Sequence, residues 1–486
     1  MDTSIASSVS TDLDDLNEGS FNPAQSILLG QPDELAASIA STYVPDATHT
    51  RDIPESVDTM SHSVILAPLS LPSASSSAAA SSSISPSSSA IQLYEQYDNI
   101  YGKITISTVA KRITEHPWFR RLQDIKQLGP LHFKFPHATH SRFSHSIGVA
   151  YLARMAGQVL RGKNTGITDR EILCLEIAAL CHDIGHGAYS HSFDHLLRDI
   201  GFKSVTSHHE VRSQIITKRL IESIPELNIS PDEIRLIQYF IDTDKYKLVN
   251  TEAPPRYTAG LEQIVSNPIH KLDVDKMDYL LRDAQALRFD LTIDGTLDVR
   301  GLIKRSQLVY EEKDQTVYWM FHIRDQGIVY DLICRRFIFY NNYYVHPHVN
   351  SINCMLTDAL RIVNRVTGYA ECVKLETPEH IAQYVQLTDA YFLELILNST
   401  DGRLSEAKDL IERIVMGKNW YEHMGDFVTN IDNLDETSYV ELPWEIFTDK
   451  STPTTLLPKV RYHQNGLPIK PADVKNTRRL YRKPDV

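Results

Sequence analysis

EILCLEIAALCHDIGHGAYSHSFDH, residues 171–195, joins an apolar helical run to a group of histidines. The run has helical spacing, and a His-Asp pair follows it directly at residues 182 and 183. Gly185 and Gly187 then end the helix and leave space beside the pair. One His-Asp dipeptide alone carries little information, because the 20 histidines of this chain should produce roughly one by chance.

Histidines are concentrated around this pair. Six of them lie between residues 182 and 209, where composition alone predicts roughly one. Imidazole and carboxylate groups suit a borderline or hard cation, and a further His and Asp would complete four protein ligands. Coordination positions on the metal would then remain free for water or phosphate oxygens, as catalysis by a metal requires. A single histidine in such a place is more often a hydrogen-bonded core residue, so the prediction rests on the cluster.

Helical periodicity continues on both sides of this segment. Apolar residues recur at spacings of three and four over 107–116, 118–128, 141–160, 193–201 and 208–224. Alternation over 307–322 predicts a small antiparallel hairpin, after which helical spacing resumes over 330–363 with Pro347 as a break. The sequence therefore predicts an all-α, mainly helical fold with a small β-hairpin.

Composition divides the chain into three regions. Residues 1–92 contain eleven acidic residues, one basic residue and a Ser/Ala/Pro tract, so we expect disorder there. The folded body is expected over 93–430. Residues 431–486 are Pro-punctuated and basic at their end, which is more often a solvated tail than a nuclear-targeting signal.

Charge and hydropathy exclude several classes of protein. The first 92 residues contribute −10 of the formal charge of −13, so the body is nearly neutral and nucleic acid is a possible but not a primary partner. No stretch approaches the roughly 20 apolar residues that span a bilayer, and no signal peptide is visible. We expect an intracellular protein, in nucleus or cytoplasm, without membrane contact. Its five cysteines lack a Cys-x-x-Cys pair and are expected to be reduced.

Several segments, in order, resemble those of one known family. They are ITEHPWFRRLQDIKQLG, FPHATHSRFSHSIGVAYLA, CHDIGHGAYSHSFD, the His-Glu of SHHE, DVDKMDYLLRD, and the Tyr-His region with LTDAL. They resemble the metazoan SAM-and-HD-domain deoxynucleoside triphosphate triphosphohydrolases and, more distantly, bacterial dGTPases. The likeness covers roughly residues 92–365, without a visible sterile-alpha-motif domain. It implies the helical HD-domain phosphohydrolase fold, with His145, His182, Asp183 and Asp275 as metal ligands.

The resemblance also implies a reaction. The family cleaves between the 5′ oxygen and the α-phosphorus of a deoxynucleoside triphosphate (dNTP), releasing a deoxynucleoside and inorganic triphosphate. His186, Asp194 and His209 match its acid-base group, and His186 is the expected proton donor, because a histidine oriented by a carboxylate can protonate a leaving oxygen near neutral pH. Two His and two carboxylates suit Fe, Mn, Zn or Ni at the HD site, with Mg²⁺ accompanying the triphosphate.

Further side chains match substrate contacts of the family. They fall into three groups. The first would bind the triphosphate, the second would bind the sugar 3′-hydroxyl, and the third would leave no room for a 2′-hydroxyl. These are Arg142, Lys276, Arg336, Tyr279 and His191 for the triphosphate, Gln127 and Asp283 for the 3′-hydroxyl, and Leu128 with Tyr344 for deoxyribose selectivity.

The chain departs from the family at two places. Val345 replaces a glutamine at the base end of the pocket, which leaves base preference open. The family assembles into tetramers through guanine-nucleotide activator sites; the matching positions here are Glu115, Arg120 and Gln123, with Tyr94 in place of a phosphate-binding lysine. A homo-oligomer, dimer or tetramer, is expected, but activation by GTP is doubtful.

Two rival functions stay open. One is an HD phosphohydrolase that acts on nucleotide monophosphates or a cyclic dinucleotide. The other is a nucleotide sensor or single-strand nucleic-acid binder without turnover. The near-neutral body and the complete acid-base group argue against the second.

Overall fold

The computed structural model describes residues 92–163, 166–289, 297–418, 420–421, 462–464 and 467–468. These residues all lie in one compact unit, Ser85–Val486. The region expected to be disordered, apart from Gln92, and most of the expected tail lie outside the described residues.

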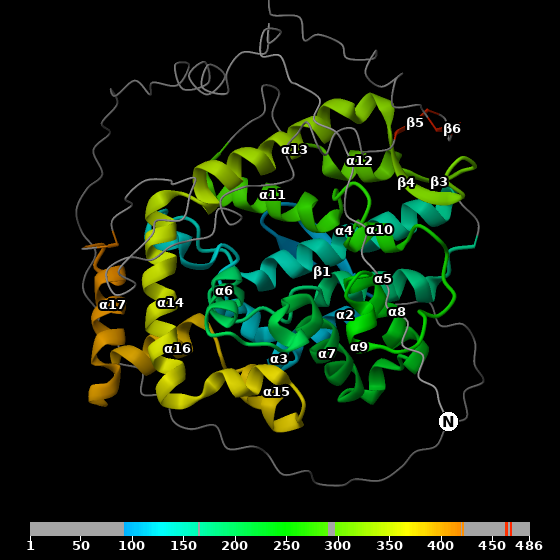
Figure 1. The fold of residues 1–486 in the computed structure, drawn as a ribbon. Coiled ribbons are helices and arrows are strands. Elements are labelled where there is room, and N and C mark those ends of the chain that lie inside the picture. The colour runs from blue at the N-terminus through cyan, green and yellow to red at the C-terminus, as the bar shows by residue number, and fades with distance from the viewer. Residues whose placement is uncertain are drawn as a thin grey trace, which may run out of the picture. The chain divides into compact units, whose positions relative to one another are not determined.

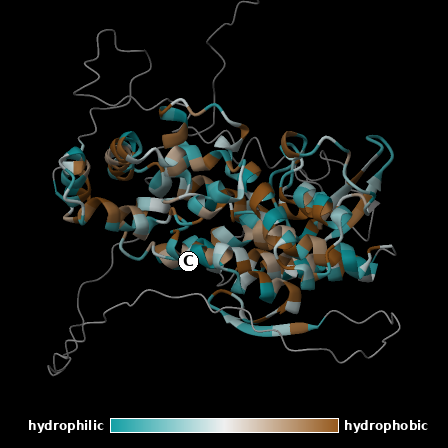
Figure 2. Cartoon of the chain, turned by 90° about the horizontal axis from the view of Figure 1, so that it is seen from below, coloured by the Kyte–Doolittle hydropathy of each residue, from teal (hydrophilic) through white to brown (hydrophobic). Residues whose placement is uncertain are grey.

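Helices make up most of this unit, which confirms the predicted mainly helical fold (Figure 1). Its centre is formed by α4 (Arg142–Lys163), α5 (Asp169–Cys181), α8 (Pro231–Ile241) and α11 (Val274–Leu287). α4 packs against α5 and α11, and α5 also packs against α8. Figure 2 shows helices with apolar and polar sides, the pattern of amphipathic helices that share one core.

The buried helix α5 holds the end that carries the His-Asp pair. A capping box of Thr168 and Glu171 satisfies the first backbone N–H groups of the helix. Every residue from Ile172 to Cys181 is buried. The helix therefore presents residues 182 and 183 from a fixed position in the core.

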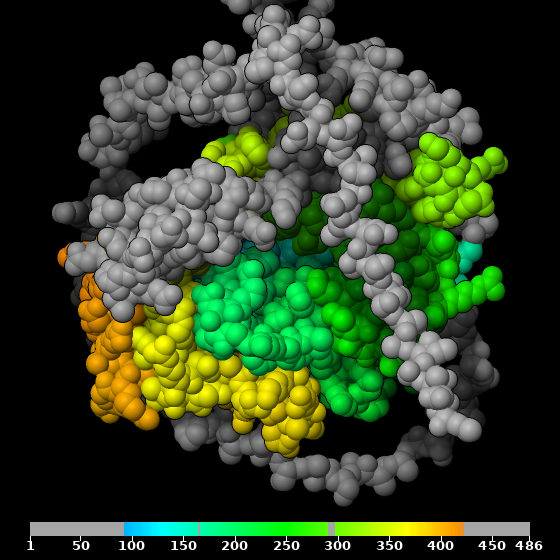
Figure 3. Space-filling view, in the orientation of Figure 1, coloured from blue at the N-terminus to red at the C-terminus, as the bar shows by residue number. Residues whose placement is uncertain are grey.

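Shorter helices surround this centre. Those in the first part of the unit are α2 (Thr108–Glu115), α3 (Pro117–Arg120), α6 (His191–Asp199), α7 (His209–Glu222), α9 (Tyr246–Val249), α10 (Glu262–Val265) and α12 (Val299–Arg305). Those that follow are α13 (Gln326–Phe339), α14 (Pro347–Thr367), α15 (Pro378–Tyr384), α16 (Asp389–Leu397) and α17 (Ser405–Val415). α14 packs against both α6 and α17, and Figure 3 shows these green-cyan, yellow and orange segments adjoining on one face.

Three antiparallel strand pairs accompany the helices in the described part of the chain. β3 (Gln307–Glu311) and β4 (Thr316–His322) form the hairpin predicted over 307–322. β1 (Leu93–Asp98) and β2 (Gly102–Ser107) form a second hairpin, so the prediction of one hairpin was incomplete. β4 also pairs in parallel with β5 (Tyr462–Gln464), which pairs with β6 (Leu467–Pro468). Part of the region expected to be a solvated tail therefore extends this sheet.

The predicted break at Pro347 is confirmed. α13 ends at Phe339, a π-helical turn follows over Tyr340–Tyr344, and Pro347 is the first residue of α14. Proline suits that position because the first N–H groups of a helix have no partner within it.

No helix among the described residues has the length and apolar character needed to cross a membrane. All five cysteines are free thiols; four are buried, and Cys334 is partly buried. This agrees with the expectation of reduced core thiols.

Candidate active site

The His-Asp pair lies in the turn after α5, and glycine allows this turn to pack closely. A Cβ atom on Gly185 would lie 2.2 Å from the carbonyl oxygen of His209 and 2.3 Å from the backbone nitrogen of Ser213. The backbone N–H of Gly185 donates to Ser213 Oγ at 2.9 Å. The turn therefore rests directly on the first residues of α7, which brings His209 to the pair.

The structure brings the four predicted metal ligands together from α4, the end of α5 and α11. His145 Nε2 lies 3.1 Å from Asp275 Oδ1 and 3.5 Å from Asp183 Oδ2. His182 Nε2 lies 3.4 Å from Asp275 Oδ1 and 3.5 Å from Asp183 Oδ1. Ligands bonded to one ion at about 2.0–2.2 Å stand about 3–3.5 Å apart, so His145, His182 and Asp275 could share a cation. Asp183 adjoins this group, but it approaches the two histidines through different oxygens.

The protonation of these groups also fits a cation. The ring Nδ1–H of His182 donates to the carbonyl of Ala179 at 2.7 Å, and its buried Nε2 has no hydrogen-bond partner among the described residues. Burial raises the pKa of Asp183, but Arg142 and His182 outweigh it and hold that pKa well below its usual range. Burial lowers the pKa of His145, but hydrogen bonds with Asp275 and Asp278 raise it to about 9. Protonated imidazole thus supplies the positive charge that the carboxylates require, and a divalent ion would supply the same charge.

Asp278, which the sequence analysis did not select, orients His145. Its Oδ2 accepts from His145 Nδ1 at 2.8 Å, which leaves Nε2 directed at the candidate metal position. Arg282 donates twice to Asp278 at 2.8 Å and once to Asp98 in β1 at 3.0 Å. All of these side chains are buried. The sequence did contain a clue to this role, because Asp278 lies three residues after Asp275 and therefore on the same face of one helix.

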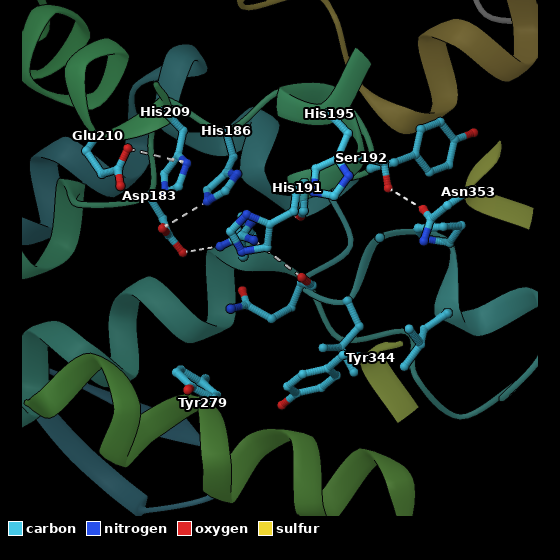
Figure 4. A pocket seen from close by; sticks show the side chains of 18 of the residues that line it. Asp183, His186, His191, Ser192, His195, His209, Glu210, Tyr279, Tyr344 and Asn353 are labelled. Carbon is cyan, nitrogen blue, oxygen red and sulfur yellow. Dashed lines mark hydrogen bonds and ion pairs between the residues drawn. The ribbon is translucent and has the colours of Figure 1, made fainter. Parts of the chain in front are cut away.

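A second cluster adjoins the first. His186 Nε2 lies 3.4 Å from Asp183 Oδ1, and the His186 ring stacks on the His209 ring with centroids 3.8 Å apart and planes 23° apart. His209 Nδ1 donates to Asp194 Oδ2 at 2.8 Å, and Arg212 also donates to Asp194. Figure 4 shows the rings of His186 and His209 next to each other beside Asp183. The structure therefore brings the predicted acid-base residues together.

The two stacked histidines differ in charge. Burial lowers the pKa of His209, but the carboxylates of Glu210 and Asp194 outweigh it and raise that pKa above its usual value. Burial and the charge of Arg142 hold the pKa of His186 well below its usual value. Of the two, His209 therefore keeps its proton to the higher pH.

This second cluster suits proton transfer better than a second metal. Donor atoms of His186, His191, Asp194 and His209 all lie within 4.8 Å of one another. An imidazole binds an ion in its ring plane, however, and two nearly parallel stacked rings do not point to one position. The donor atoms of Asp194 and His209 are also already bonded to each other.

A cavity of about 910 Å³ opens beside both clusters, a size that suits a nucleotide. His145 and Asp194 lie behind its wall, whereas His182, Asp183, His186, His209 and Asp275 line it. All predicted substrate contacts line it as well: Gln127, Leu128, Arg142, His191, Lys276, Tyr279, Asp283, Arg336 and Tyr344.

Three cationic side chains are expected to bind the triphosphate, and each makes a hydrogen bond or ion pair with another residue of the protein. Arg142 donates to Asp183 and, through Nε, to Ser190 Oγ at 2.8 Å. Lys276 Nζ lies 3.1 Å from Asp273 Oδ2, and Arg336 Nε donates to the Tyr279 hydroxyl at 3.2 Å. Their positions are thus fixed before a ligand binds.

The sugar-binding candidates form a second bonded group. Asp283 accepts from His140 Nε2 at 2.8 Å and from the Tyr344 hydroxyl. Gln127 Oε1 is buried without a hydrogen-bond partner among the described residues, as an atom awaiting a ligand would be. His140 is a further residue that the sequence analysis missed; it lies in the segment FPHATH, but its partner is 143 positions away.

Comparison with known proteins agrees with this geometry. A family model described as the HD domain matches residues 142–283, the range that contains all four candidate metal ligands. The chain is 32% identical over 377 residues to the mouse deoxynucleoside triphosphate triphosphohydrolase SAMHD1, covering 72% of this chain and 56% of the mouse protein. The human SAMHD1 is 32% identical over 373 residues, covering 73% and 58%.

A more distant organism gives the same result. The SAMHD1 homolog of Dictyostelium discoideum is 30% identical over 343 residues, covering 69% of this chain and 61% of that protein. The chain thus spans somewhat over half the length of these relatives. With the matched domain and the helical fold, the chain is an HD-domain protein that is similar over most of its length to the SAMHD1 proteins.

Proposed function

We propose that this protein hydrolyses dNTPs to a deoxynucleoside and inorganic triphosphate in a metal-dependent reaction. The observation that carries the proposal is a cavity that adjoins a two-His, two-Asp group, a stacked histidine pair and three fixed cations. The names of the similar SAMHD1 proteins state this activity for them.

His145, His182, Asp183 and Asp275 would hold a divalent cation, for which Fe, Mn, Zn and Ni are all suitable. When bound, such a cation supplies Lewis-acid polarisation of phosphate oxygens. The wall cations Arg142, Lys276 and Arg336 would bind the triphosphate, with Mg²⁺ as its companion, because three fixed positive charges offset most of its charge and set its orientation.

The acid-base work is assigned to the stacked pair. The raised pKa of His209 favours its protonated form, Asp194 fixes its ring, and His186 lies between it and the candidate metal ligands. We assign delivery of a proton to the leaving 5′ oxygen to His186, which would take up that proton when the negatively charged substrate binds and raises its pKa. His191, 5.0 Å from His186 between ring centroids, would contact the phosphates from the cavity rim.

The sugar end favours a deoxyribose. Gln127 and Asp283 would bond the 3′-hydroxyl, and Leu128 and Tyr344 would occupy the space that a 2′-hydroxyl needs. Because Tyr344 is fixed to Asp283, its ring does not move away freely to admit a ribonucleotide.

Product analysis tests the proposal. Purified protein with Mn²⁺ is incubated with each of the four dNTPs, and the products are separated by ion-exchange chromatography. The expected products are a deoxynucleoside and inorganic triphosphate. A monophosphate with pyrophosphate would contradict the proposal, and activity confined to nucleotide monophosphates or a cyclic dinucleotide would favour the rival HD phosphohydrolase.

A further inference from the structure

The turn that follows the histidine cluster has a strained backbone. Tyr189 and Ser190 both have positive φ, 56° and 58°, in a region that residues with side chains rarely adopt. Such a conformation persists only where neighbouring groups fix it, and it occurs most often at functional sites. The contacts that fix this turn therefore bear on the cavity it lines.

Asp389, the first residue of α16, supplies these contacts. Its Oδ1 accepts from the Tyr189 N–H at 2.6 Å, and its Oδ2 accepts from the Lys126 N–H at 3.0 Å. The Tyr189 hydroxyl also donates to the carbonyl oxygen of Asp389 at 3.4 Å. Asp389 is 5% exposed and does not line the cavity, so its carboxylate joins two segments from behind the wall.

Each joined segment continues directly into the cavity. Lys126 precedes Gln127 and Leu128, the candidates for sugar contact. Ser190 follows Tyr189, and its hydroxyl donates to the Lys126 carbonyl at 2.6 Å while it accepts from Arg142 Nε at 2.8 Å. One chain of hydrogen bonds thus runs from Asp389 through both segments to Arg142.

We propose that Asp389 is a positioning residue for the nucleotide pocket, which fixes the sugar-facing segment 127–128 relative to Arg142 on the phosphate side. The inference rests on the proposed function and adds to it a residue outside the matched HD domain, which ends at residue 283. Asp389 touches no substrate; it acts through the two backbone segments.

The surroundings of the carboxylate support a clamp role. Asp389 makes no ion pair among the described residues, and its two oxygens bind backbone N–H groups. Burial raises the pKa of Asp389 to about 6, and the negative charge of Asp124 also raises it. The two backbone N–H groups and the charge of Lys126 lower it, but by less. Arg121 is a further charged group near it. Burying a carboxylate without an ion pair costs free energy, and the two backbone N–H groups that Asp389 accepts from offset part of that cost.

The test compares Asp389→Asn with the wild type and with Glu394→Gln, an exposed acid on the same helix. An amide accepts through one oxygen only, so the variant keeps the size of the side chain but loses one backbone contact. Binding of the 2′-deoxy and ribo forms of adenosine 5′-(α-thio)triphosphate, which resists hydrolysis, is measured by calorimetry alongside dATP turnover. We expect Asp389→Asn to weaken binding of the deoxy form about tenfold and to reduce the deoxy-to-ribo preference by a similar factor. Glu394→Gln should match the wild type.

The outcomes separate this inference from the proposed function. A wild type that binds the deoxy analogue but hydrolyses no dNTP would remove the proposed function and leave the binding comparison valid. Wild-type affinity and preference in a folded Asp389→Asn would overturn the positioning role. If Asp389→Asn unfolds, Ser190→Ala is used instead, because it removes the hydrogen bonds of Ser190 to Lys126 and Arg142 without changing a buried charge. An unchanged deoxy-to-ribo preference in Ser190→Ala would also overturn the positioning role.

Discussion

At the scale of single residues, the His-Asp pair tests the metal assignment. His182 and Asp183 follow α5 and contribute donor atoms rather than packing, so changing both to alanine should remove bound metal and keep the helical content. Elemental analysis and circular dichroism measure the two effects. His208→Ala, an exposed neighbour of the cluster, is the control and should keep its metal. Full metal content in the double variant would show that these two residues are not ligands.

A second residue-scale prediction concerns pH. The pKa of His209 is raised above 6.5, because Glu210 and Asp194 outweigh burial. Its imidazolium therefore persists to higher pH than that of an ordinary histidine and is lost as the pH rises through the raised folded pKa. We expect an alkaline limb of kcat/KM above that pH, and we expect His209→Gln to abolish this limb and lower kcat about 10²–10⁴-fold. An alkaline limb that persists in His209→Gln would assign the proton to another group.

At the scale of elements, the close approach of α4 and α11 positions the candidate metal ligands. A Cβ atom on Gly148 would lie 2.0 Å from Asp278 Oδ1 and 2.4 Å from Arg282 Nη2, in the buried group that orients His145. Gly148→Ala should cost about 1–3 kcal/mol in the free energy of unfolding and weaken metal binding about 10–100-fold. Urea denaturation and metal titration measure these effects.

A matched control lies on the same helix. Gly162 in α4 has no atom within 4 Å of an added Cβ, so Gly162→Ala should leave metal affinity unchanged and stabilise the protein by up to about 1 kcal/mol. Equal metal affinity in Gly148→Ala and the wild type would mean that the Asp278 contact does not orient His145.

The elements also show what sequence patterns could reveal. The hairpin at 307–322 was predicted because alternation marks its strands. β1 and β2 were not predicted as a hairpin although apolar and polar residues alternate over 93–107, and β1 leaves its apolar residues Leu93 and Tyr97 exposed. The end of α5 was predicted from its glycines. The contact of Arg282 with Asp98 in β1, 184 positions away, was not predicted, because local periodicity carries no information on which distant side chains meet.

At the scale of the whole molecule, the candidate site extends beyond the matched HD domain. The candidate metal ligands and the candidate acid-base residues were expected from resemblance and lie within residues 142–283, but Gln127, Arg336 and Tyr344 also line the cavity. Asp389 lies further still along the chain, and no motif marked it. A buried carboxylate that binds backbone N–H groups depends on packing of the complete chain, so only the folded molecule reveals it.

The last prediction concerns control of the whole molecule by guanine nucleotide. At the positions that match the family's activator site, Tyr94 replaces a lysine and lies under the Lys111 ammonium at 4.8 Å, while Glu115 pairs with Lys111 at 3.2 Å. Arg120 and Gln123, both exposed, change the pattern of donors and acceptors that a guanine edge would meet. Each unmatched polar group typically costs about 1–3 kcal/mol, so we expect GTP near 1 mM to stimulate dNTP hydrolysis less than about threefold. Hydrolysis assays with and without GTP, combined with light scattering, measure the effect, and stimulation of about tenfold or more together with tetramer formation would show that these substitutions preserve a GTP site.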